Sequence, residues 1–213
     1  MKISDILPYV VNDLPGCPAI IATQGVLLAA RELCQRTLCW DEFQDPVALV
    51  NKVSSYDLEA PSGASAYTIR DVFCGNAKLR AISMNELQDL LPNWRTATGN
   101  MPVFYTRATD RAQVTVYPTP DQVISGTKLV FRVTYVPILS ATTVPDFLGT
   151  DYLDAITAGA KARLMLSPGA TYANPSLAPV HRAVFEDAIT QAIAETLHER
   201  AQGTVTVRPR AFI

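Results

Sequence analysis

The residues best suited to acid–base or metal chemistry stand far apart in this sequence. The two histidines, His181 and His198, are seventeen positions apart within one expected helix. At ~1.5 Å per residue they are ~25 Å apart, too far to share a metal ion or a proton. His198 in His198-Glu199-Arg200, near a helix C-terminus, suits a favourable contact with the helix dipole. Neither histidine therefore predicts a catalytic site.

Acidic residues cluster at Asp41-Glu42-Asp45 and at Asp146 with Asp151 and Asp154. The first cluster fits the end of a strand. The second fits the first turns of a helix, where the helix dipole stabilises negative charge. A glycosidase-like carboxylate pair could be drawn from these residues, although no spacing favours one. A small cytoplasmic hydrolase that uses an unrecognised carboxylate pair is therefore kept as an alternative.

Cysteines and glycines form no chemical motif. The four cysteines are Cys17, Cys34, Cys39 and Cys74, too few for a disulfide scaffold and without a C-x2-C pair. We expect buried free thiols, which pack as small hydrophobic side chains, and no zinc site. The ten glycines form no phosphate-binding, dinucleotide-binding or nucleophile-elbow motif, and H-E-x-x-H is absent. The sequence therefore predicts no catalytic residue, metal or cofactor, and it favours a protein that is not an enzyme.

The composition indicates a globular chain that is poor in charged residues and has a large apolar surface to bury. Of its 213 residues, 48% are hydrophobic and 18% are charged, against ~25% charged in typical soluble domains. Such a chain must bury surface in its own core or against partners. The net charge of −2 gives no basic field for nucleic acid. No apolar run is long enough to span a membrane, and no secretory signal is evident, so we expect synthesis in the cytoplasm.

Helical spacing of apolar residues appears at both ends of the chain. A helix after Pro18 is expected to bury positions 20, 27, 34 and 38, with Leu28 and Ala30 beside them. A helix of about 30 Å is expected from 144–146 until the breaker at 167–169, and another from Ser176 to Gly203. Alanines lie on more than one stripe of the last helix (Ala183, Ala188, Ala192, Ala194 and Ala201). We therefore expect that helix to lie in the core and also at a contact between subunits.

The middle of the chain predicts β structure. Alternation over 112–117 and 128–135 is typical of strands with one wet face. The turn-rich connection between them predicts a hairpin with an exposed tip at 119–126 that could carry recognition. Weaker strand candidates are 38–43, 54–58, 66–73 and 103–107. Ser83-Met84-Asn85-Glu86 is a capping box for a short helix that ends at Pro92, with Leu87, Leu90 and Leu91 on its apolar face.

These elements predict an α+β fold. The N- and C-terminal helices form a helical bundle, an antiparallel β lobe is inserted into it, and the chain ends in an extended C-terminal arm. The expected boundaries are 1–40 for the N-terminal segment and first bundle helix, 41–143 for the β lobe, 144–203 for the long helices, and 204–213 for the arm.

The terminal segment 204–213 is the candidate binding element. Val205 and Val207 alternate with threonines, and Pro209 prevents a continuing helix. Such a segment can add a strand to a partner's sheet edge, seat its apolar end in a groove and pair its arginines with acids. The alternative is that it folds back onto its own β lobe. The predicted partner-binding residues are Val205, Val207, Arg208, Arg210, Phe212 and Ile213.

The order of several segments resembles a known family. They are Leu7-Pro8-Tyr9-Val10, Pro15-Gly16-Cys17-Pro18, Ala30-Arg31-Glu32-Leu33-Cys34-Gln35-Arg36-Thr37, Trp40, Tyr56-Asp57-Leu58 with Pro61-Ser62-Gly63, 114–120, Val144-Pro145-Asp146-Phe147-Leu148 and Gly159-Ala160-Lys161-Ala162-Arg163-Leu164. Together they resemble the head-to-tail adaptor (connector) proteins of tailed bacteriophages, particularly short-tailed ones. The resemblance covers nearly the whole chain and rests on the order of the segments.

The resemblance implies a structural virion protein at the neck, assembled in the host cytoplasm. Such proteins form a ring, commonly of twelve subunits, under the portal protein ring. They extend the DNA channel, give the tail tube or nozzle proteins a platform, and grip the portal with a C-terminal arm. The implied partners are the portal ring, neighbouring copies and tail proteins, with genomic DNA only as cargo and no membrane. A stand-alone interaction domain is a further alternative.

Overall fold

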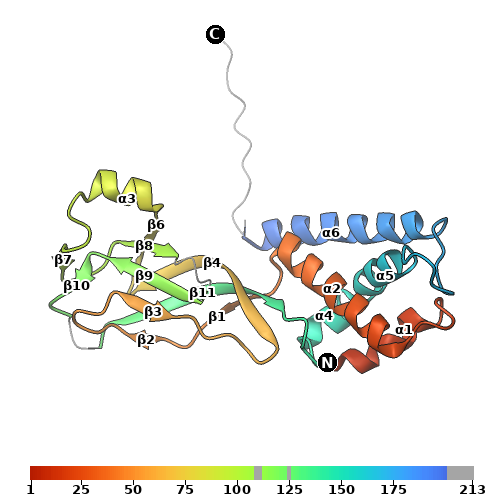
Figure 1. Ribbon diagram of the computed structural model, residues 1–213. Coiled ribbons are helices and arrows are strands. Elements are labelled where there is room, and N and C mark those ends of the chain that lie inside the picture. The colour runs from red at the N-terminus through yellow and green to blue at the C-terminus, as the bar shows by residue number, and fades with distance from the viewer. Residues whose placement is uncertain (108–111, 124–125, 201–213) are drawn as a thin grey trace, which may run out of the picture. The chain divides into compact units, whose positions relative to one another are not determined.

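The structure is a computed structural model that describes residues 1–107, 112–123 and 126–200, the last four of these by their backbone alone. Within this range it is a mixed α+β fold with six α-helices and several sheets, which confirms the predicted class. The chain divides into two compact units (Figure 1). The helical unit comprises Met1–Cys39 and Thr142–Ile213, and the strand unit comprises Trp40–Ala141.

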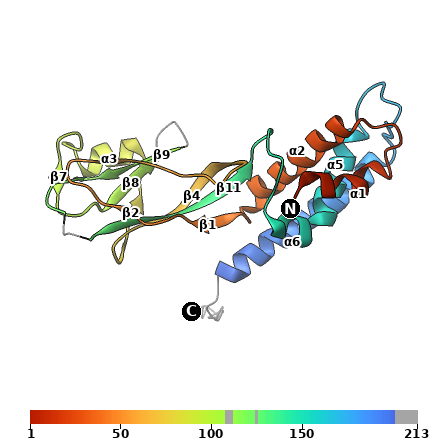
Figure 2. The same ribbon diagram turned by 90° about the horizontal axis from the view of Figure 1, so that it is seen from below.

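The helical unit is built on three helices that pack against one another, α2 (Ala19–Thr37), α5 (Leu153–Leu164) and α6 (Ala178–Arg200) (Figures 1 and 2). Shorter elements complete it: η1 (Ile3–Asp5), α1 (Leu7–Val11) and α4 (Asp146–Thr150). None of the helices in the described part of the chain has both the length and the apolarity to span a bilayer.

Small residues let the three long helices approach closely. A Cβ atom added at Gly25 would lie 2.9 Å from Cδ1 of Leu164. One added at Gly159 would lie 2.9 Å from the ring of Phe185 and 3.1 Å from Cβ of Ala29. Both distances are below ordinary carbon–carbon contact, so neither glycine has room for a side chain. At these two glycines, the backbone of one helix therefore lies directly against side chains of the next.

Three helix predictions need correction. Ile20 and Leu28 were expected in the buried stripe of α2 but are 70% and 37% exposed, whereas Ala22, Val26 and Leu33 fill the core. The single helix expected from 144–146 is divided into α4 and α5 at Tyr152, whose φ of −117° is not helical. At the end of α4, Thr150 Oγ1 is within hydrogen-bond distance of the Phe147 carbonyl, at 3.3 Å, and of Asp151 Oδ1, at 2.9 Å.

The last helix also begins later than expected. Ser176 was predicted as its start, but α6 begins at Ala178. The Asn174 carbonyl accepts from the backbone N–H groups of Leu177 and Ala178, both at 3.1 Å, and so closes the preceding turn. The expected closing residue, Gly203, lies outside the described residues.

The strand unit contains a first sheet in the order β1-β11-β4-β5, with β2 also paired to β11. Its strands are β1 (Asp41–Phe43), β2 (Val47–Ala48), β4 (Ala64–Cys74), β5 (Ala77–Lys78) and β11 (Lys128–Pro137). All its pairs are antiparallel. Two register shifts between β4 and β11 leave Tyr67 and Arg70 as extra residues in β4, so this strand carries two bulges.

A second sheet has the order β3-β9-β8-β6, and β7 pairs with β10. These strands are β3 (Ser55–Asp57), β6 (Arg80–Ala81), β7 (Thr98–Gly99), β8 (Phe104–Arg107), β9 (Gln113–Tyr117) and β10 (Thr119–Pro120). Two strand pairs of this unit depart from the predicted antiparallel pattern, because β6–β8 in the second sheet and the separate pair β7–β10 are parallel. All the strands predicted from alternation are present, and the two-residue strands were not predicted.

The predicted hairpin between 112–117 and 128–135 is wrong. The two strands, β9 and β11, belong to different sheets. Pro118 and Pro120 have no N–H to donate, so the chain leaves the second sheet after β9 and pairs Thr119–Pro120 with β7 instead. The expected exposed tip is also only partly right, because Pro120 is buried while Asp121 and Gln122 are exposed.

The short helix α3 (Met84–Leu90) has half of the predicted capping box. The backbone N–H of Glu86 donates to Ser83 Oγ at 3.2 Å, while the Glu86 carboxylate pairs with Arg80. Leu87 is fully buried, but Leu90 was wrongly placed on the apolar face and is 53% exposed. Leu87 forms a small separate core with Ile82 and Tyr117.

Candidate interaction site

The outward side of α6 carries apolar residues that the helical unit does not bury. We call this set the α6 outer stripe; it consists of Leu177, in the turn directly before α6, and Val180, Ala183, Val184 and Ala194. Leu177, Val180 and Val184 are 46%, 57% and 48% exposed, and both alanines are exposed. Leu177, Val180, Ala183 and Val184 follow one another at spacings of three or four residues, and Ala194 lies eleven residues, about three turns, after Ala183, so all five share one side of the helix.

The other side of α6 faces the core. Phe185 and Ile189 are fully buried and Ala192 is 1% exposed. The prediction that alanines of α6 lie on more than one stripe is therefore confirmed by the exposed Ala183 and Ala194 and the buried Ala192. A helix that only covers a core usually has a polar outward side, so the outer stripe is the best candidate for a protein–protein contact in this unit.

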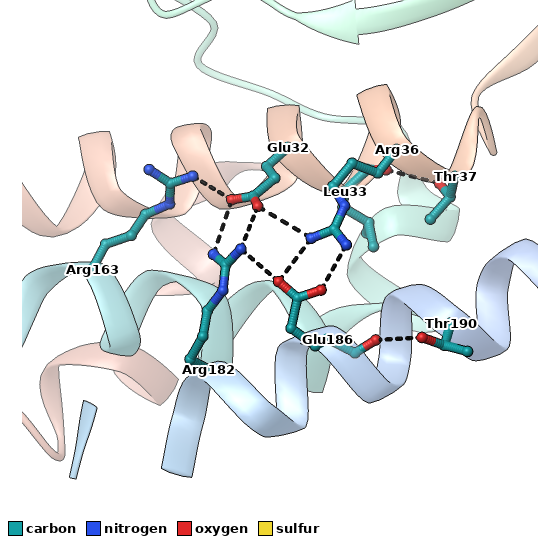
Figure 3. Close-up of polar contacts among 8 residues, drawn as sticks. All are labelled: Glu32, Leu33, Arg36, Thr37, Arg163, Arg182, Glu186 and Thr190. Carbon is teal, nitrogen blue, oxygen red and sulfur yellow. Dashed lines mark hydrogen bonds and ion pairs between the residues drawn. The ribbon is translucent and has the colours of Figure 1, made fainter. Parts of the chain in front are cut away.

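A charged cluster, which we call the seam, connects the three long helices beside this stripe (Figure 3). It consists of Glu32 and Arg36 from α2, Arg163 from α5, and Arg182 and Glu186 from α6. Arg36 binds Glu186 through two hydrogen bonds of 2.8 and 2.6 Å. Arg182 Nη2 lies 2.8 Å from Glu32 Oε1 and 2.5 Å from Glu186 Oε1. Arg163 also donates to Glu32.

The arginines keep both carboxylates of the seam ionised. Hydrogen bonds from Arg36 are the main cause that lowers the pKa of Glu186 to about 2. Burial by itself raises the pKa of Glu32, but Arg182 and Arg163 outweigh it and the net shift is downward. Carboxylates this acidic do not accept protons near neutral pH, so the seam is suited to holding helices together rather than to acid–base catalysis.

Other reactive groups in the described residues are dispersed. No group of three or more His, Cys, Asp or Glu there could hold a metal ion. Cys17, Cys34 and Cys74 are buried as predicted, whereas Cys39 is half-buried. Burial raises the pKa of the Cys17 and Cys74 thiols, which keeps them protonated.

The acidic residues of the two predicted clusters also have structural roles. Asp41, in β1, pairs with Arg132 at 2.8 Å, and Arg132 also lies 3.7 Å from Asp71 on β4. Asp146 stands in the first turn of α4, as predicted for a residue stabilised by the helix dipole. His181 lies half-buried on α6. The side chain of His198 lies outside the described part.

The predicted partner-binding residues Val205, Val207, Arg208, Arg210, Phe212 and Ile213 lie outside the described residues. Local sequence patterns in turn carry no sign of the seam, because its members are up to 150 positions apart. Each seam residue by itself resembles an ordinary charge on an exposed helix surface.

In the described part of the chain, the exposed apolar surface of α6 and the charged seam suit a protein that binds other proteins. A family model for the SU10 adaptor protein matches residues 1–210. The chain therefore belongs to this family of phage head–tail adaptors, which is named after the short-tailed phage SU10. This confirms the resemblance found in the sequence and makes the chain a structural component of a phage virion. A comparison with curated proteins gives no match.

Proposed function

We propose that this chain forms a ring of twelve copies under the portal protein ring, in the neck of the virion. The ring extends the DNA channel and gives the tail tube or nozzle proteins a platform. Genomic DNA passes through it only as cargo, and no membrane, metal or cofactor takes part. The chain is assembled in the host cytoplasm and is not an enzyme. Family membership over residues 1–210 is the observation that carries this proposal.

The finer architecture belongs to the same proposal. Residues 1–40 and 144–203 form one helical bundle, residues 41–143 form an inserted lobe, and residues 204–213 form an extended arm. The lobe, with the exposed Asp121 and Gln122 near one of its turns, is the part that meets the tail. The α6 outer stripe supports a subunit contact in the bundle, because a ring needs apolar surface that the isolated subunit leaves exposed.

Native mass spectrometry of the full chain, alone and mixed with portal rings, tests the ring. We expect a closed oligomer in at least one of the two samples, and electron microscopy gives its symmetry. A chain that is monomeric at every concentration, with and without portal rings, contradicts the proposal. Turnover of a glycoside or ester substrate by that monomer would instead favour the hydrolase alternative.

The arm has its own test. Removing residues 204–213 is expected to leave thermal stability nearly unchanged, because a terminal segment contributes few core contacts. The same truncation is expected to abolish attachment to portal rings, measured by co-sedimentation. A full-length chain with residues 204–213 in scrambled order is the matched control and should also fail to attach. Undiminished attachment of the truncated chain shows that the arm is not the anchor.

A further inference from the structure

The strand unit contains a gap between two sheet edges. On one side β4 pairs with β11 along nearly its whole length, but on its other side only Phe73 and Cys74 have a strand partner, β5. The edge strand of the second sheet, β6, lies across the gap. A cavity of about 390 Å³ occupies this place. Its walls are Thr68 and Ile69 of β4, Ala81 and Ile82, Ser83 before α3, and Tyr105 and Arg107 of β8.

Hydrogen bonds connect the two walls near both ends of the cavity, which is open to solvent between them. At one end the Leu79 N–H donates to the Val72 carbonyl at 2.8 Å. At the other end Arg107 donates to the Tyr67 carbonyl at 2.5 Å and to the Ala66 carbonyl at 3.4 Å. Residues 68–71 of β4 lie between these bonds. The open edge therefore has the length of four extended residues, about 13 Å.

The lining suits a short extended peptide with alternating hydroxyl and aliphatic side chains. Thr68, Ser83 and Tyr105 supply hydroxyl groups, and Ile69, Ala81 and Ile82 supply apolar surface. The bulge at Tyr67 directly precedes the open edge, and the bulge at Arg70 lies within it. Bulges and charged side chains are the means by which edge strands avoid indiscriminate pairing, so the site admits a short segment and excludes a long strand.

We propose that residues Thr204–Val207 of a second copy of this chain bind in this cavity as an added strand along residues 68–71 of β4. Thr-Val-Thr-Val has the alternation that the lining requires and carries no charge. Only residues 201–203 separate Arg200 from Thr204, so the strand unit that receives the segment must lie within about 14 Å of the end of α6 in the ring. Residues 208–213 stay available for the portal contact proposed above. This inference rests on the proposed ring.

The test is a cross-link between two populations of full-length chains, one with Thr68→Cys and one with Val207→Cys. Copper–phenanthroline is the oxidant: two thiols lose two protons and two electrons to copper(II) and form one disulfide. We expect a reducible dimer band in the mixed ring and none when Phe43→Cys replaces Thr68→Cys. Phe43 is 61% exposed on β1, at the opposite edge of the same sheet.

Ala81→Cys, an exposed position on the other wall, repeats the test if Thr68→Cys disturbs folding. Rings that form without this cross-link overturn the inference and leave the proposed function intact. So does a disulfide found only inside a doubly substituted chain, because the segment then folds back on its own strand unit. Absence of any ring in native mass spectrometry overturns the proposed function and, with it, this inference.

Discussion

The two units of this protein bury their apolar residues by different means. In the helical unit, three long helices meet at glycine and alanine, so the backbone of one helix touches a side chain of the next. In the strand unit, the core is divided between two sheets and a small separate cluster around Leu87. The stability of the helical unit is therefore most sensitive to added side-chain volume in its core, and that of the strand unit to lost side-chain volume.

Two neighbouring alanines of α6 give the largest expected contrast. Ala192→Arg places a charge where the side chain is 1% exposed, so we expect a loss of several kcal/mol and an unfolded helical unit. Ala194→Arg lies on the exposed outer stripe and should change the unfolding free energy by less than about 0.5 kcal/mol. Denaturant unfolding followed by circular dichroism measures both variants. Ala194→Arg should nevertheless impair the ring, and normal assembly of that variant contradicts the proposed subunit contact.

Leu87→Ala tests loss of volume in the strand unit. Leu87 is fully buried, so the cavity should cost about 2–5 kcal/mol. Hydrogen exchange should locate the weakening in α3 and its neighbours. Leu90→Ala is the matched control, because Leu90 lies in the same helix but is 53% exposed. Equal destabilisation by the two variants would show that the cluster around Leu87 contributes little.

Gly159→Ala tests added volume in the helical unit. The new Cβ would lie 2.9 Å from the Phe185 ring, and overpacking of this kind costs about 1–3 kcal/mol. The better helix propensity of alanine offsets up to about 1 kcal/mol of that cost. The double variant Gly159→Ala/Phe185→Leu should recover part of the loss if the ring is the obstacle. A Gly159→Ala protein more stable than the wild type contradicts this account of the helix contact.

The smallest expected effect is the pH dependence of the seam. The folded pKa of Glu186 is about 2, below its ordinary value of 4.5. Its stabilising contribution is therefore complete above pH 4.5 and is lost as the pH falls toward 2. Glu186→Gln should flatten the fall in unfolding free energy within this window. Glu186 is 37% exposed, so the difference is modest and should shrink in high salt; a slope unchanged by the substitution contradicts the assignment.

Local sequence patterns predicted the elements of both units but not their boundaries or partners. Helical and strand spacing of apolar residues identified α2, α5, α6, β4, β9 and β11. The four-residue spacing from Leu148 to Leu164 concealed the break at Tyr152, since a turn between two helices can keep apolar residues in register. The hairpin prediction failed although β9 and β11 are neighbours in sequence, because Pro118 and Pro120 have no backbone N–H to donate and the chain leaves the second sheet after β9.

The interaction surfaces were predictable to different degrees. Alanines on more than one stripe of α6 were predictable from the sequence, and Ala183 and Ala194 are exposed whereas Ala192 is buried. The seam was not predictable, since an isolated Glu32 or Arg163 gives no sign of a partner more than a hundred residues away. The cavity beside β4 depends on how two sheets face each other, which alternation within one strand does not indicate.

The long sequence separation in the seam has a consequence for synthesis. Glu32 and Arg163 are 131 positions apart, and Arg36 and Glu186 are 150 apart, whereas the strand unit is one continuous stretch. During synthesis, the strand unit is therefore complete before α5 and α6 have been made. Until then, α2 exposes the apolar side that packs against these two helices. Chains truncated after residue 150 and released from the ribosome should show a trypsin-resistant strand unit and cleavage at Arg31 and Arg36. Resistance of α2 to trypsin in those chains would show that its apolar side is covered before α5 and α6 are made.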